Sequence, residues 1–162
     1  MLADILTGVQ GSGVAAGLRG STWLYPLVNA GHIVGIALLF GAIVPLDLRL
    51  IGLWQRLPLE SLSRVLIPVA GAGFALALAC GALLFIAKAN DYAASTLFQA
   101  KMLVLAFALV NALAFAVLHR RRKHRADQAV PTRPALSQRI IGATSLAAWL
   151  AVILLGRLIG YF

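Results

Sequence analysis

The chain has 162 residues, of which 61% are hydrophobic and 12% charged, and its formal net charge is +9. Soluble domains carry about 25% charged residues, and so short a chain cannot hide this much apolar surface inside a globule. Ten of the fourteen Lys and Arg residues lie beside apolar runs, in the segments 49–64 and 120–139. This placement indicates orientation in a membrane and argues against nucleic-acid binding. The single cysteine, Cys80, excludes a disulfide within the chain.

The predicted elements begin with an N-terminal segment, residues 1–22, which lacks the basic and apolar regions of a secretory signal. We expect residues 2–18 of it to form a short helix on the outer membrane surface. Four uncharged stretches follow, and each approaches the roughly 20 apolar residues that cross a bilayer. They predict helices at about residues 22–47, 62–88, 97–119 and 135–160. The expected fold class is therefore all-α, a four-helix transmembrane bundle over residues 23–162.

The basic residues predict which side of the membrane each connection faces. The first and third connections hold ten of them, and the other segments outside the membrane hold only Arg19, Lys88, Lys101 and Arg157. Basic connections stay in the cytoplasm, so both termini are expected on the outer side. Aromatic side chains then fall at the outer interface, where amphipathic rings are favoured.

Small residues recur at helical spacing in the predicted spans. Gly31 and Gly35 form a GxxxG pair in the first, and Gly156 and Gly160 repeat it in the fourth. In lipid, such residues let helix backbones approach closely. Packing within the bundle and dimerisation through one of these faces are the two alternatives.

His32 and Asn111 are the candidate site residues, because polar side chains inside a bilayer are costly and mark function. His32 lies nine residues after Trp23, at a depth of about 14 Å, and Asn111 lies at about 15 Å on a helix that runs in the same direction. We therefore expect them to share one layer. Either both form hydrogen bonds that fix the helix register, or the His32 imidazole is an axial ligand of a haem b.

A second protein ligand for a haem iron is not within reach of His32. The other histidine of a span, His119, lies at the inner end of the third helix, about 22 Å from the depth of His32. A haem with a single protein ligand, a haem at a dimer interface, or no haem remain as alternatives. A copper site formed by His32 and Cys80 is a further alternative, but two protein ligands are too few to assign a metal.

Other charged residues are expected at the membrane surfaces. Asp47 and Arg49 are assigned to the headgroups, and Arg157 to an anchor near the outer end. A basic cluster is a solvated stop-transfer segment, or binds anionic lipid or a haem propionate; it comprises Arg120, Arg121, Arg122 and Lys123. No catalytic nucleophile, phosphate-binding loop, zinc spacing or pair of intramembrane carboxylates is visible, so an enzyme is not favoured.

Several motifs resemble a family of small bacterial four-helix membrane proteins of unknown function. They are Trp23-Leu24-Tyr25-Pro26-Leu27-Val28, His32, Gly35, Asp47-Leu48-Arg49-Leu50-Ile51-Gly52, Lys101, Asn111-Ala112-Leu113, Phe115, Ser145-Leu146, Trp149, Gly156-Arg157 and Tyr161. The chain departs from that family at Asn29, where an acid is usual, and at Ala116, where a histidine is usual. A more distant likeness is to copper-resistance D proteins and four-helix haem-b protoporphyrinogen oxidases. The oxidase likeness implies haem at His32 with Lys101 as a partner residue.

Together these observations predict a multi-pass protein of the bacterial inner membrane with both termini on the periplasmic side. The first functional hypothesis is a non-enzymatic accessory subunit that packs against a larger membrane complex or a second copy of itself through its small-residue faces. The alternative is a membrane redox protein that binds haem b through His32.

Overall fold

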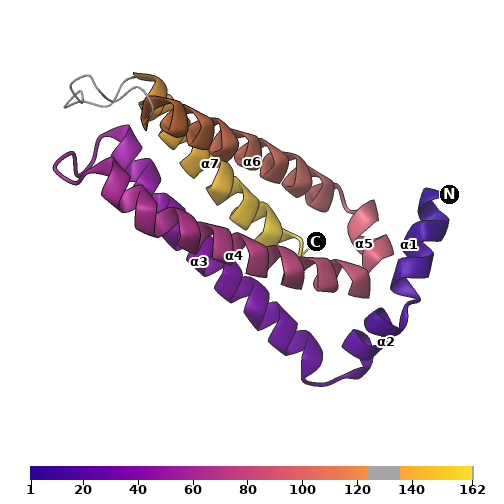
Figure 1. Ribbon diagram of the computed structural model, residues 1–162. Helices are drawn as coiled ribbons and strands as arrows, with labels where there is room; N and C mark the ends of the chain where they lie inside the picture. The colour runs from indigo at the N-terminus through magenta and orange to yellow at the C-terminus, as the bar shows by residue number, and fades with distance from the viewer. Residues whose placement is uncertain (124–135, 162) are drawn as a thin grey trace.

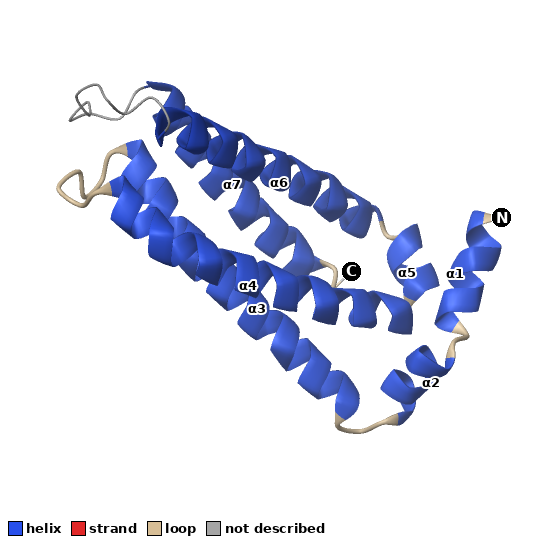
Figure 2. Cartoon of the chain, viewed as in Figure 1, coloured by secondary structure: helices blue, strands red, loops and turns tan. Residues whose placement is uncertain are grey.

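The computed structural model describes residues 1–123 and 136–161, and every regular element in them is a helix (Figure 2). Three are short: α1 (Leu2–Gln10), α2 (Gly13–Gly20) and α5 (Ala89–Ala94). Four are long and apolar enough to cross a membrane: α3 (Leu24–Ile51), α4 (Leu59–Ala87), α6 (Thr96–Lys123, of which 96–117 are apolar) and α7 (Leu136–Leu158). The predicted all-α, four-helix fold of a multi-pass membrane protein is confirmed.

The first span is longer than predicted at its inner end. Helix α3 continues past Pro45 and Asp47 to Ile51, since membrane helices tolerate an internal proline when neighbouring groups satisfy the freed carbonyl. It ends at Gly52, which has a φ of +124° and whose N–H bonds the carbonyl of Leu48. A backbone of that kind favours glycine, so Gly52 and not the first acidic residue ends the helix.

The four long helices form an incomplete ring. Helix α3 packs against α4 on one side and α7 on the other, and α6 packs against α7 (Figure 1). No Cα atoms of α4 and α6 come within 8 Å of each other in the described residues. Three sides of the bundle are therefore closed by close backbone contacts, whereas α4 and α6 meet through side chains, such as the stacked rings of Phe85 and Phe98.

The contact between α3 and α4 depends on small residues. A Cβ atom added to Gly35 would lie 2.5 Å from the backbone nitrogen of Ala77, and one added to Gly73 would lie 2.5 Å from that of Leu39. Real Cβ atoms do not approach backbone so closely, so only glycine fits at either position. The GxxxG pair of α3 thus packs against α4 of the same chain, as the alternative of packing within the bundle predicts.

The N-terminal segment forms two short helices where one was expected. The Arg19 side chain donates to the carbonyls of Ala87, at the end of α4, and of Gln10, at 2.8 and 2.9 Å. The Gln10 side-chain oxygen accepts from the Asn90 N–H in α5 at 2.9 Å. These bonds fasten α1 and α2 to the corner between α4 and α5.

An aromatic cluster lies beside this corner. The rings of Phe85, Tyr92 and Phe98 stack with centroid separations of 5.4 to 6.3 Å. Burial, and then the neighbouring Tyr25, raise the pKa of the Tyr92 phenol above its ordinary value. The cluster joins the ends of α4, α5 and α6 at the side of the membrane where aromatic residues were predicted.

Candidate functional site

Asp47 lies inside the bundle, and the expectation that it sits among lipid headgroups is wrong. Its exposed fraction is 5%, because α3 carries it one turn short of the helix end and turns it toward α7. The hydroxyl of Ser145 on α7 donates a hydrogen bond to the carboxyl. The other carboxyl oxygen, Oδ2, is buried and has no hydrogen-bond partner among the described residues.

Trp149 is the second buried polar residue without a partner. Its exposed fraction is 4%, and its indole Nε1 bonds to nothing in the part of the chain that the structure describes. Trp149 follows Ser145 by four residues on α7, so the two share one helix face and are about 5–6 Å apart at their Cβ atoms. Because Ser145 bonds Asp47, this face of α7 is the one that meets the carboxyl.

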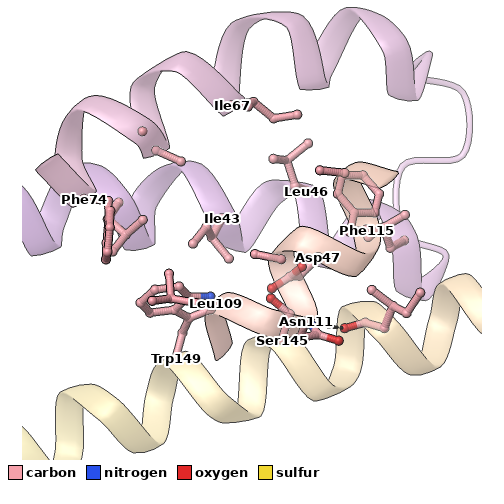
Figure 3. A pocket seen from close by; sticks show the side chains of 17 residues that line it. Ile43, Leu46, Asp47, Ile67, Phe74, Leu109, Asn111, Phe115, Ser145 and Trp149 are labelled. Atoms are coloured by element: carbon pink, nitrogen blue, oxygen red, sulfur yellow. Dashed lines mark hydrogen bonds between the residues drawn. The ribbon is translucent and has the colours of Figure 1, made fainter. Parts of the chain in front are cut away.

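Both unpaired atoms belong to residues that line one cavity, of about 240 Å³. All four long helices contribute to its wall, and most of the wall is apolar, with Leu46, Ile67, Phe74, Leu109 and Phe115 among its residues (Figure 3). Among the residues whose side chains are described, no lysine, arginine or histidine lines it. The view also shows the Trp149 nitrogen on the side of its ring that faces Asp47. The cavity thus combines an apolar wall with two polar atoms that lack partners.

Asn111 is a member of this site, but its amide is already engaged. Its Nδ2 donates to the carbonyl of Ile141 on α7 at 3.2 Å, and Asn111 also lines the cavity. The bond joins α6 to α7, which is the role in helix register that the sequence suggested. In membrane proteins such bonds contribute about 0.6 kcal/mol on average.

His32 lies elsewhere, and the prediction that it shares a layer with Asn111 is wrong. Its Nδ1 lies 2.7 Å from the carbonyl of Ala77, and a Cβ on Gly81 would come within 3.0 Å of the ring. His32 interacts electrostatically with Lys101, and Asn111 is ten residues, about 15 Å, farther along α6. The depth predicted for Asn111 was its distance from Lys101, which had been assigned to a segment outside the membrane.

Lys101 lies near enough to His32 for an electrostatic interaction, and this second polar group does not line the cavity. A Cβ on Gly156 of α7 would lie 3.2 Å from the Lys101 Nζ, so the glycine gives the lysine side chain its space. Cys80 also belongs to this level, because its Sγ would lie 2.9 Å from a Cβ on Gly31. The cavity and this group therefore occupy different depths of the bundle.

The hydrogen bond of His32 supports its predicted role in fixing helix register. With Nδ1 bonded to Ala77, the other ring nitrogen, Nε2, is the atom that could bind an iron, but His32 does not line the cavity. Among the described residues no three His, Cys, Asp or Glu side chains form a group that could hold a metal ion. Haem ligation by His32, and copper binding by His32 and Cys80, stay predictions.

The predicted lipid contacts divide into two groups. The side chains of Arg120, Arg121, Arg122 and Lys123 lie outside the described residues. Arg157 is described: its guanidinium hydrogen-bonds the Tyr161 hydroxyl and lies 4.7 Å from the centre of that ring. A cation over an exposed tyrosine near a helix end is consistent with an interfacial anchor.

Comparisons with known proteins leave this site to be interpreted from its own residues. No family model matches the chain, and neither a curated protein nor a solved structure matches it. The resemblance drawn from the sequence motifs therefore stays a prediction.

Sequence reasoning missed the three residues that make the site polar: Asp47, Ser145 and Trp149. Two signals were available. Leucines flank Asp47 at positions 46, 48 and 50, so the apolar run continues past the acid. Ser145 and Trp149 are four residues apart and must share a helix face. Neither signal predicts that α7 would present this face to α3.

Proposed function

We propose that this multi-pass membrane protein binds a small lipid-soluble molecule in the cavity between its four spans. The carrying observation is the pair of buried, unpartnered polar atoms, Asp47 Oδ2 and Trp149 Nε1, beside an otherwise apolar cavity. A buried polar atom without a partner costs about 1–3 kcal/mol. Folded proteins keep few such atoms, and a ligand that supplies the missing bond is one explanation for them.

The size of the cavity favours a small ligand over bound water alone. A water molecule occupies about 30 Å³ of liquid and needs two to four polar partners. The cavity of about 240 Å³ is several times larger, and most of its wall is apolar. It is slightly smaller than pockets for whole drug-sized molecules, which start near 300 Å³. One ring, or a short length of chain, fits this space.

The side of the bundle between α4 and α6 supports entry from the membrane. Helices α4 and α6 both line the cavity, yet their backbones do not meet in the described residues. A molecule dissolved in the bilayer can enter between them without crossing water, and a long tail can remain in the lipid.

Two glycines provide the variants for a test. Gly71 on α4 lines the cavity, and Gly41 on α3 does not. A Cβ at either position would meet nothing within 4 Å. Gly71→Leu should therefore fill cavity space, whereas Gly41→Leu adds the same side chain to the same type of helix away from it.

The experiment compares the small molecules retained by each variant. Wild-type protein, Gly71→Leu and Gly41→Leu are purified in nanodiscs of one lipid extract and analysed by mass spectrometry. We expect a species enriched in the wild type and in Gly41→Leu, and depleted in Gly71→Leu. Identical extracts from all three proteins would refute a ligand in this cavity.

The accessory-subunit hypothesis is a second candidate, supported by the packing of α6. In the described residues α7 is the only long helix whose Cα atoms come within 8 Å of those of α6, and α6 exposes Leu103, Phe107 and Val110 along one side. A partner subunit could cover this stripe. Cross-linking in intact membranes from a photoreactive residue at position 107 should then give one defined protein adduct, and adducts to lipid alone would contradict the hypothesis.

The haem alternative has its own test in the visible spectrum of the purified chain. A Soret band that shifts on reduction and disappears in His32→Ala would support ligation by His32. A colourless protein from haem-replete cells would contradict it.

A further inference from the structure

We propose that the group recognised in the cavity is a carbonyl oxygen on an apolar body, bound by two donors, the Asp47 carboxylic acid and the Trp149 indole. This inference rests on the proposed ligand-binding function and specifies its chemistry. It follows from asking which ligand group can bond both Asp47 and Trp149, the two buried side chains that have an atom without a partner in the described residues.

The surroundings of Asp47 favour the neutral acid. A buried carboxylate loses several kcal/mol of solvation unless a cation pairs with it. No basic side chain lines the cavity in the part of the chain whose side chains are described. The ion pairs of the described residues, Met1 with Asp4 and Glu60 with Arg64, lie outside the cavity. Asp47 therefore fits this place as an uncharged group.

The contact with Ser145 distinguishes the two oxygens of the carboxyl. Ser145 hydrogen-bonds the carboxyl, and we assign the carbonyl role to the oxygen that meets its hydroxyl. The remaining oxygen, Oδ2, is the hydroxyl and needs an acceptor. It is the atom that the structure leaves buried and unpartnered.

Trp149 presents the same requirement, because an indole N–H is a donor only. The cavity thus has two unpartnered donors in its wall, and an oxygen with two lone pairs can accept from both. A carbonyl oxygen accepts both bonds and has no hydrogen of its own. A hydroxyl would also bring a hydrogen that needs an acceptor, whereas the two unpartnered groups are both donors. A protonated carboxyl is a recognised donor to a ligand oxygen in apolar active sites, as in ketosteroid isomerase.

The wall of the cavity indicates the body that carries this oxygen. Phe74 and Phe115 line it together with branched aliphatic side chains, which suits a flat ring or an alkyl chain. Two classes of membrane compound supply a carbonyl on such a body: a quinone, through its ring, and an acyl lipid, through its ester. The experiment separates the two sources.

Binding is measured with three probes on the full chain in nanodiscs, as bound probe above that in empty nanodiscs. The probes are a decyl-substituted benzoquinone, its hydroquinone, and the methyl ester of a fatty acid. The quinone and hydroquinone share one carbon skeleton and differ in carbonyl against hydroxyl. We expect the quinone to bind at least about 10-fold more tightly than the hydroquinone. If the ester binds and the quinone does not, the carbonyl inference is supported and the source is an acyl lipid.

Four variants test the two donors. Trp149→Phe keeps an aromatic ring and removes the N–H, and Asp47→Leu removes the acid. Each should weaken binding of the carbonyl probe by about 3- to 10-fold, the range expected for one lost hydrogen bond. Asp47→Asn retains a donor and should stay within about 3-fold of the wild type. Trp54→Phe replaces an exposed tryptophan of the loop after α3 and should change nothing. Helical circular dichroism confirms that each variant is folded.

The outcomes separate this inference from the function on which it rests. A hydroxyl probe that binds as tightly as its carbonyl partner, or a Trp149→Phe protein that binds normally, overturns the carbonyl inference and leaves the cavity as a binding site. If no probe binds but wild-type extracts contain a species that Gly71→Leu lacks, the chemistry proposed here is wrong and the ligand function stands. If no probe binds and the extracts are identical, both fail.

Discussion

Replacing Asp47 by leucine should stabilise the ligand-free protein. The buried Oδ2 has no partner among the described residues, and such an atom costs about 1–3 kcal/mol. Leucine has a similar size, places apolar atoms against the apolar wall of the cavity and removes that cost. The Ser145 hydroxyl loses its acceptor, but a serine in a helix can donate to the carbonyl four residues earlier. We therefore expect the free energy of unfolding to rise by about 1–3 kcal/mol.

The assay is reversible unfolding of the delipidated protein in mixed micelles, followed by circular dichroism. Asp47→Asn is the matched control, because it keeps the shape and leaves a polar group in the same place, and it should show little or none of the gain. If Asp47→Leu is less stable than the wild type, the carboxyl has a partner that stabilises the fold, and the argument for an unsatisfied site fails. A variant that is more stable and no longer binds ligand would mark Asp47 as retained for function at the expense of stability.

Two further predictions concern packing. Gly35→Ala should lower the free energy of unfolding by about 1–3 kcal/mol, because its Cβ would meet the backbone of Ala77 at 2.5 Å. The control is Gly41→Ala in the same helix, whose Cβ meets nothing within 4 Å, so this variant should be more stable by up to about 1 kcal/mol. Equal effects of the two variants in the same micelle assay would contradict the tight contact. Arg19→Ala removes the bonds to Ala87 and to α1, so amide hydrogen exchange should accelerate in residues 2–20 and stay unchanged in α6; unchanged exchange in residues 2–20 would show that Arg19 does not hold the segment.

The number and approximate positions of the spans could be predicted from the sequence because long apolar runs have few alternatives. The end of α3 could not be found by looking for the first acid. Asp47 remains inside the helix, and Gly52, with its positive φ, ends it. The prediction treated charge as a boundary, whereas a bundle interior can hold a carboxyl that bonds a neighbouring serine.

The site itself depends on which helices meet, and the sequence carries little information on that point. In a membrane protein both the lipid-facing and the buried sides of a helix are apolar, so periodicity does not separate them. The level of Asn111 was predicted from its distance to Lys101, which was taken to lie at the outer surface, but Lys101 interacts electrostatically with His32 within the bundle. Asn111 was therefore placed beside His32, when it belongs with Asp47 and Trp149 around the cavity.

The glycine contact between α3 and α4 also has a consequence for the order in which the chain is assembled during synthesis. These helices are joined by a loop of only seven residues, 52–58, and their closest backbone contacts lie within the first half of the sequence. Neighbouring segments of this kind can dock while the ribosome is still producing the second half. Of the four spans, α7 is synthesised after the other three, and it supplies Trp149. The two donors of the proposed site, Asp47 and Trp149, thus come together only when α7 inserts beside a hairpin that is already in place.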